Sequence, residues 1–88
     1  MRFTTARLCG GRALMAVPSE DLDIDMSAAR GIVESMGGDI VSSDDMMIVY
    51  NWNGMETTLY SQGKIMFYPL EDKPLCIRYA TETLEKLV

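Results

Sequence analysis

A chain of 88 residues with 48% apolar and 24% charged residues has the composition of one globular domain, long enough for one sheet backed by helices. No apolar run approaches the roughly 20 residues that span a bilayer, and the first residues lack a signal-peptide pattern, so we expect a cytoplasmic protein with no membrane contact. The net charge of −5 disfavours non-specific binding to nucleic acid, which depends on lysine and arginine neutralising phosphates.

The chain has no histidine and only two cysteines, Cys9 and Cys76. This composition disfavours a zinc site and excludes the Ser-His and Cys-His pairs of nucleophilic enzymes. No pair of carboxylates is placed in a credible pocket either, so we predict a non-catalytic protein without cofactor or metal. Cys76 falls on the apolar stripe of an expected helix, which favours a buried thiol, whereas the role of Cys9 is left open.

The first elements in chain order are a strand and a helix. Residues 1–11 are weakly patterned, and the sequence leaves open whether this N-terminal segment is flexible or ordered. The apolar run at 12–17 predicts a strand. Asp25 or Ser27 can cap a helix, and Gly37-Gly38 ends it. Its apolar stripe consists of Ala29, Ile32, Val33 and Met36.

A series of short strands follows. We expect strands at 39–42, 46–52, 55–60 and 64–68, with Asn53-Gly54 as the strongest hairpin signal. The pair Asp72 and Pro74 then predicts the start of a helix. The apolar stripe of that helix consists of Leu75, Cys76, Tyr79, Ala80, Leu84 and Leu87.

The predicted order is therefore β-α-β-β-β-β-α, with residues 12–88 as a single domain. Helices gathered on one face of an antiparallel sheet make an α+β fold. We expect an antiparallel sheet of about five strands with two helices on one face.

The stretch 57–68, "TTLYSQGKIMFY", resembles a segment of the TATA-box-binding protein family, in which a strand ending in an aromatic residue runs into a Ser-Gly-Lys turn. The resemblance extends at the level of pattern over residues 12–88, and it implies a fold similar to one half of that family's saddle. The family binds the DNA minor groove with its open, concave sheet face and kinks it with aromatic wedges. A saddle made from this chain would need two copies.

Alternation of side chains along each strand assigns the two faces on the matched register. The concave face would carry Ala13, Met15, Val17, Met47, Val49, Thr58, Tyr60, Met66 and Tyr68. The helix-facing side would carry Leu14, Ala16, Met46, Ile48, Tyr50, Leu59, Ile65 and Phe67, an almost wholly apolar set, as a core requires.

Departures from the family pattern weaken the DNA-binding expectation. One wedge position falls at Ser43, which cannot intercalate, and the other at Tyr60, whose hydroxyl needs hydration. The family's base-contacting asparagine falls at Ala13. Asp44 and Asp45 lie beside the lost wedge, where they would repel phosphates.

These observations favour a small interaction module. Its predicted interaction face consists of Met15, Val17, Met47, Val49, Thr58, Tyr60, Met66 and Tyr68. Methionine and tyrosine suit protein interfaces, so we expect self-association, such as a homodimer, or another protein partner. Two alternatives are a nucleic-acid-binding protein related to the TATA-box-binding protein and a domain that binds a small ligand. A third reading of the same face is that residues 1–11 simply cover it.

Overall fold

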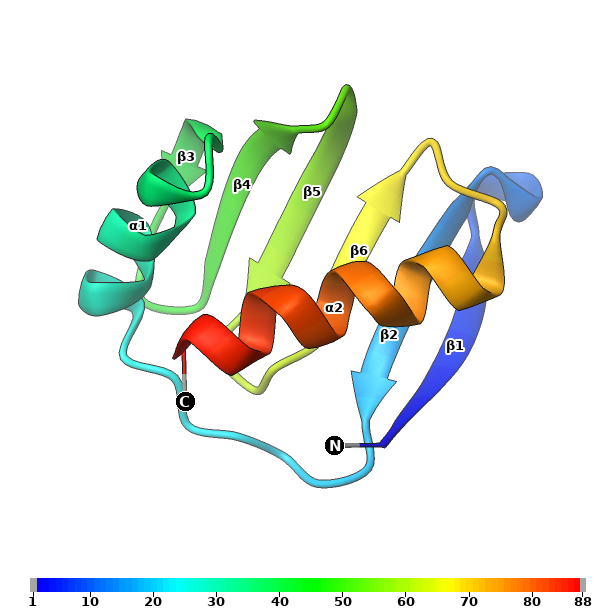
Figure 1. The fold of residues 1–88 in the computed structure, drawn as a ribbon, viewed down its shortest axis with the longest axis horizontal. Helices are drawn as coiled ribbons and strands as arrows, with labels where there is room; N and C mark the ends of the chain where they lie inside the picture. The colour runs from blue at the N-terminus through cyan, green and yellow to red at the C-terminus, as the bar shows by residue number, and fades with distance from the viewer. Residues whose placement is uncertain (1, 88) are drawn as a thin grey trace.

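The computed structural model describes residues 2–87 and shows an α+β fold with a six-stranded antiparallel sheet. The strands lie in the order β1-β2-β6-β5-β4-β3, and both helices lie on the same face of the sheet (Figure 1). The predicted fold class is confirmed. The elements are β1 (Phe3–Leu8), η1 (Cys9–Gly11), β2 (Ala13–Pro18), α1 (Met26–Ser35), β3 (Asp39–Ser43), β4 (Met47–Trp52), β5 (Met55–Tyr60), β6 (Ile65–Tyr68) and α2 (Lys73–Leu87).

The sheet has one strand more than expected, because Phe3–Leu8 forms β1. This strand pairs antiparallel with β2 along its whole length, from Phe3 opposite Pro18 to Leu8 opposite Ala13. It extends the sheet sideways at the β2 edge (Figure 1). The N-terminal segment therefore lies beside the face opposite the helices and does not cover it.

Local signals fix the ends of α1. The Oδ1 atom of Asp25 accepts hydrogen bonds from the backbone N–H groups of Ser27, at 3.0 Å, and Ala28, at 3.3 Å, so Asp25 is the N-cap. Gly37 follows the helix with a φ of 90°, a conformation that favours glycine. A Cβ atom on Gly38 would lie 2.6 Å from Cγ1 of Val33, so glycine is also required there for space.

The β4–β5 hairpin and the start of α2 also follow from local chemistry. Asn53 and Gly54 have φ values of 52° and 75°, as the tight hairpin turn requires. After β6, the Oδ1 atom of Asp72 accepts a hydrogen bond from the backbone N–H of Leu75 at 3.1 Å. The expected helix start at this aspartate is thus confirmed.

The core fills the space between the sheet and the two helices. Seven of the eight residues assigned to the helix-facing side have no exposed surface. They are Leu14, Ala16, Ile48, Tyr50, Leu59, Ile65 and Phe67. The assignment of Met46 to the core is wrong: its side chain is 57% exposed. Met46 lies before β4 in a turn where its backbone N–H donates to Oδ1 of Asp44, so strand alternation does not extend to it.

An aromatic cluster packs between the sheet and the middle of α2. The ring of Trp52 meets the ring of Tyr79 edge-on at a centroid distance of 5.0 Å, and Phe67 lies 5.9 Å from Tyr79. The indole N–H of Trp52 donates to the carbonyl oxygen of Met36 at 3.3 Å. The single tryptophan therefore reports on the packing of sheet, α1 and α2 together.

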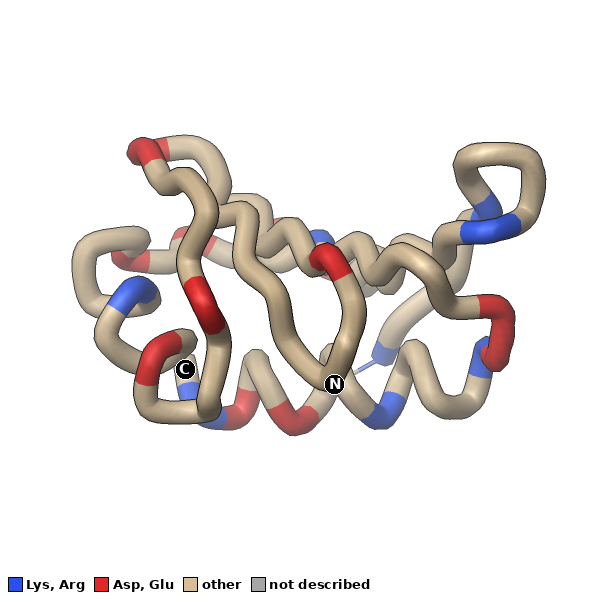
Figure 2. Tube along the Cα trace, turned by 90° about the horizontal axis from the view of Figure 1, so that it is seen from above, with Lys and Arg blue, Asp and Glu red and all other residues tan. Residues whose placement is uncertain are grey.

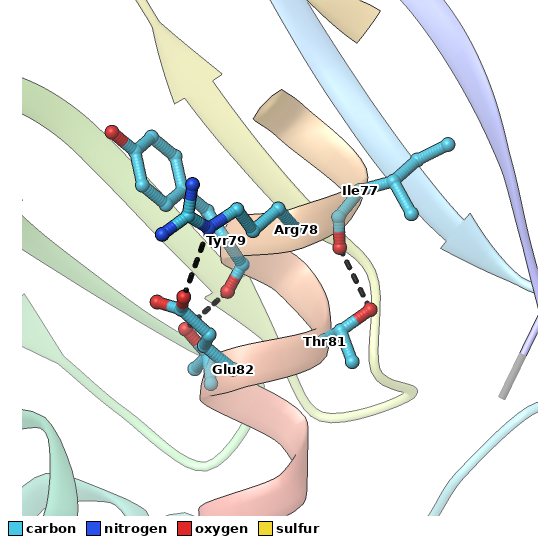
Figure 3. Close-up of polar contacts among 6 residues, drawn as sticks. Ile77, Arg78, Tyr79, Thr81 and Glu82 are labelled. Carbon is cyan, nitrogen blue, oxygen red and sulfur yellow. Dashed lines mark hydrogen bonds and ion pairs between the residues drawn. The ribbon is translucent and has the colours of Figure 1, made fainter. Parts of the chain in front are cut away.

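Polar side chains on the outer face of α2 hydrogen-bond within the helix, beside the exposed apolar side chain of Ile77 (Figure 3). Nε of Arg78 pairs with Oε1 of Glu82 at 3.3 Å, and the hydroxyl of Thr81 donates to the carbonyl oxygen of Ile77 at 2.8 Å. The buried hydroxyl of Thr83 donates to the carbonyl oxygen of Tyr79 in the same way. No helix within residues 2–87 combines the length and the apolar character that crossing a membrane requires.

Candidate interaction face

The side of the sheet opposite the helices, here called the free face, has an apolar row across its middle. The register of the strands joins cross-strand partners from one edge of the sheet to the other, and partners point to the same side. In strand order from β3 to β1, this centre row consists of Ser42, Val49, Thr58, Met66, Met15 and Ala6.

Two further rows lie on either side of the centre row. Toward the β3–β4 turn lie Met47 and its partner Tyr60, together with Val17 and its partner Thr4. Toward the β4–β5 turn lie Asp39, Asn51, Glu56, Tyr68, Ala13 and Leu8. All eight residues of the predicted interaction face are thus brought together on one side of one sheet.

The side chains of the free face shield one another only in part. Seven of the eight predicted residues are half-buried, and none of the seven is fully enclosed. Thr58 is the exception at 4% exposed, because its short side chain lies between the partners Val49 and Met66. Ala13, which alternation also assigns to this side, has no exposed surface and offers no contact area.

Nothing in the described chain packs over this face. Seen from above, the helices lie on one side of the sheet, and only turns extend on the other side (Figure 2). The β1–β2 turn and the β3–β4 turn rise from opposite ends of the sheet, away from the helices (Figure 2). The free face therefore lies between two raised turns.

The two edges of the sheet carry opposite charge. Residues 2–12, which include β1 and η1, contain Arg2, Arg7 and Arg12 and no acidic residue. Residues 39–46, which include β3, contain Asp39, Asp44 and Asp45 and no basic residue. Within residues 2–87 the one ion pair is Arg78 with Glu82 on α2, so these edge charges pair with no partner inside the described chain.

Several free-face residues were not anticipated from the sequence. Thr4, Ala6 and Leu8 belong to β1, whose polar, threonine-rich pattern gave no strand signal. Glu56 and Lys64 are exposed polar residues at the margins of the face, and their alternation along 55–60 and 64–68 could have placed them there. The face is apolar in its middle and polar toward its ends.

Neither cysteine belongs to the strand residues of the free face. Cys9 is exposed in η1, whereas Cys76 is buried on α2, as expected, and burial raises the pKa of its thiol to about 11. Burial also raises the pKa of Tyr50, which faces the core. Within residues 2–87 there is no pocket and no cluster of three or more side chains suited to hold a metal ion.

Comparison with protein-family models, with curated proteins and with solved structures finds no match to this chain.

Proposed function

We propose that this chain is a small interaction module that binds a protein surface, its own or another, through the free face. The observation that carries the proposal is the row of half-buried apolar side chains on a sheet face that both helices leave open. An antiparallel sheet can face water on one side, but that side is then ordinarily polar. Here Val49, Met66 and Met15 occupy the middle of that side.

The residue types of the free face suit protein contact. Methionine adapts its shape to a partner, and Met15, Met47 and Met66 contribute three such side chains. Tyr60 and Tyr68 supply rigid area with a polar tip that can stay hydrated or donate a hydrogen bond. Each Å² of apolar surface removed from water contributes about 25 cal/mol, so covering this face is favourable.

The resemblance to half of the TATA-box-binding protein fold remains a prediction. It is supported by the element order after β1, which is strand, helix, four strands and helix. The nucleic-acid role that it implies has less support, because Asp44 and Asp45 lie on a raised turn beside the face, and Glu56 lies on the face itself. The carboxylates of these three residues would repel the phosphates of a bound nucleic acid.

Site-specific photo-crosslinking tests the proposal. A photoreactive amino acid replaces Met66 in the middle of the free face, and a matched control replaces Glu85, which is exposed on α2. After irradiation in the expressing cell, we expect a crosslinked protein product from position 66 and none from position 85. Equal products at both positions, or none at either, would refute the use of the free face.

A further inference from the structure

The opposite charges of the two sheet edges lie at matching levels along the strands. This inference rests on the proposed function, because it names the partner of the same face. β1 and β3 run in opposite directions in the order β1-β2-β6-β5-β4-β3, all neighbours being antiparallel. Arg2, at the start of β1, is therefore level with Asp44 and Asp45, which follow β3. Arg12, beyond the other end of β1, is level with Asp39, where β3 begins.

We propose that the partner is a second copy of this chain, docked face to face about a two-fold axis that runs parallel to the strands. A rotation about such an axis places the β1 edge of one copy opposite the β3 edge of the other. It leaves the position of every residue along the strand direction unchanged. The arginine edge of each copy then lies over the aspartate edge of the other. The two contacts are equivalent by symmetry, as in isologous dimers.

The same operation brings the centre rows of the two copies together, with the methionines and Val49 in the middle of the contact. The centre row of one copy lies over the centre row of the other in reverse order. Met66 of one copy then lies over Thr58 of the other, and Met15 approaches Val49 of the other copy. Sheets packed face to face keep their strands within about 30° of each other, so the rows stay close to alignment.

The shape of the sheet fits this arrangement. The β1–β2 turn and the β3–β4 turn are raised on the free side at opposite ends of the strands (Figure 2). The strand-parallel axis places each raised turn over the opposite edge of the partner, at a level where that edge carries no raised turn. Two raised turns therefore do not collide. An axis across the strands would also keep the turns apart, but it would place the arginine edge of each copy over the arginine edge of the other.

The face is large enough for a stable dimer. The Cα extents are 31 × 27 × 19 Å, and Figure 1 looks along the shortest of them, through the helices onto the sheet. The outline of the whole molecule in that view is 31 × 27 Å, which sets an upper limit on the face of the order of the roughly 800 Å² per partner that specific interfaces bury. The chain exposes 5030 Å² in total, so the dimer would cover a modest part of it.

Pairing of the same charged edges side by side is disfavoured by the structure. In that arrangement β1 of one copy would extend the sheet at β3 of the next, and the contact would repeat without closing. The β3 edge is irregular, because the register shifts between Ile40 and Ser42 and leaves Val41 64% exposed. Bulges of this kind protect edges against strand addition.

Charge reversal tests the arrangement by sedimentation equilibrium across a concentration series. One variant carries Arg2→Glu and Arg12→Glu, and a second carries Asp39→Lys and Asp45→Lys. In the first homodimer both edge contacts become repulsive. In the second, the contact at Arg12 becomes repulsive and the contact at Arg2 loses its net attraction, because Asp44 is unchanged. We expect the dissociation constant to rise at least about tenfold in each. An equimolar mixture restores opposite charges at both contacts and should recover the two-chain mass. A single chain that carries all four substitutions should also have the two-chain mass.

Each outcome is informative. Trp52 fluorescence confirms that every variant is folded before its mass is interpreted. Unchanged dimers in both reversed variants, a mixture that stays monomeric, or masses that grow beyond two chains would each overturn the proposed arrangement. A wild-type chain that stays at 9.8 kDa at all concentrations would also overturn it. If the wild type is monomeric, crosslinks from position 66 to a different protein would still support protein binding through the free face. The absence of such crosslinks would refute protein binding through the free face as well.

Discussion

Two glycines, Gly38 between α1 and β3 and Gly31 in the middle of α1, give opposite predictions for the same substitution to alanine. In Gly38→Ala the new Cβ would lie 2.6 Å from Cγ1 of Val33, 2.8 Å from the Val33 carbonyl oxygen and 3.0 Å from Cδ2 of Tyr50. Ordinary carbon–carbon contact is about 3.5–4.0 Å, and neither neighbouring side chain has room to move, because both are fully buried. Overpacking of this kind costs about 1–3 kcal/mol.

Gly31→Ala is the matched control. Nothing lies within 4 Å of the corresponding Cβ, and Gly31 is exposed in the middle of α1. Alanine is favoured over glycine in a helix interior by about 0.5–1 kcal/mol, so this variant should be more stable than the wild type. For a domain of this size, 1 kcal/mol corresponds to roughly 4–8 °C in Tm, so the two variants should melt at least about 6 °C apart.

Urea denaturation followed by Trp52 fluorescence measures both effects, since this indole packs against Tyr79 and bonds to Met36. We expect the midpoint to fall for Gly38→Ala and to rise for Gly31→Ala, with unchanged slopes. A Gly38→Ala protein as stable as the wild type would show that the junction of α1 and β3 is not packed as described. Equal destabilisation by both substitutions would mean that backbone freedom, not space, decides at Gly38.

Two further predictions concern stability. Asp25→Ala should lower the free energy of unfolding by about 1 kcal/mol in urea denaturation, because the backbone N–H groups of Ser27 and Ala28 lose their acceptor; no change would exclude the cap. Alkaline pH should also destabilise the fold. Burial raises the pKa of the Cys76 thiol from 9.0 to about 11, so the thiol of the unfolded chain ionises at lower pH than that of the folded chain. The stability that the neutral buried thiol contributes is therefore fully present below pH 9. It is lost between pH 9 and pH 11, at up to about 1.4 kcal/mol of unfolding free energy per pH unit. Tyr50 acts in the same direction above pH 10. A Cys76→Ala chain should therefore show a shallower alkaline loss, and an equally steep one would refute this cause.

The elements that could be predicted are those with local chemical signals. Asp25 caps α1, Asn53-Gly54 turns the β4–β5 hairpin and Asp72 begins α2, each through bonds within a few residues in the chain. The division of strand residues between core and free face was also predictable, because alternation depends only on strand register.

The errors arise where structure depends on distant partners. β1 has threonines and an arginine where a strand signal would need apolar alternation, and it forms because β2 offers an open edge. Met46 was placed in the core because an apolar run does not show where a turn ends and a strand begins. The charged edges of the sheet could not be predicted either, because they become edges only once the strand order is known.

Sedimentation equilibrium of three chains tests most directly whether the free face is the surface of association. Met66→Asp places a charge in the middle of the face, and Ile77→Asp is the control, because Ile77 is the exposed apolar residue of α2, on the other side of the molecule. We predict twice the 9.8 kDa chain mass for the wild type and Ile77→Asp, and the single-chain mass for a folded Met66→Asp. The same mass for all three chains would contradict the account.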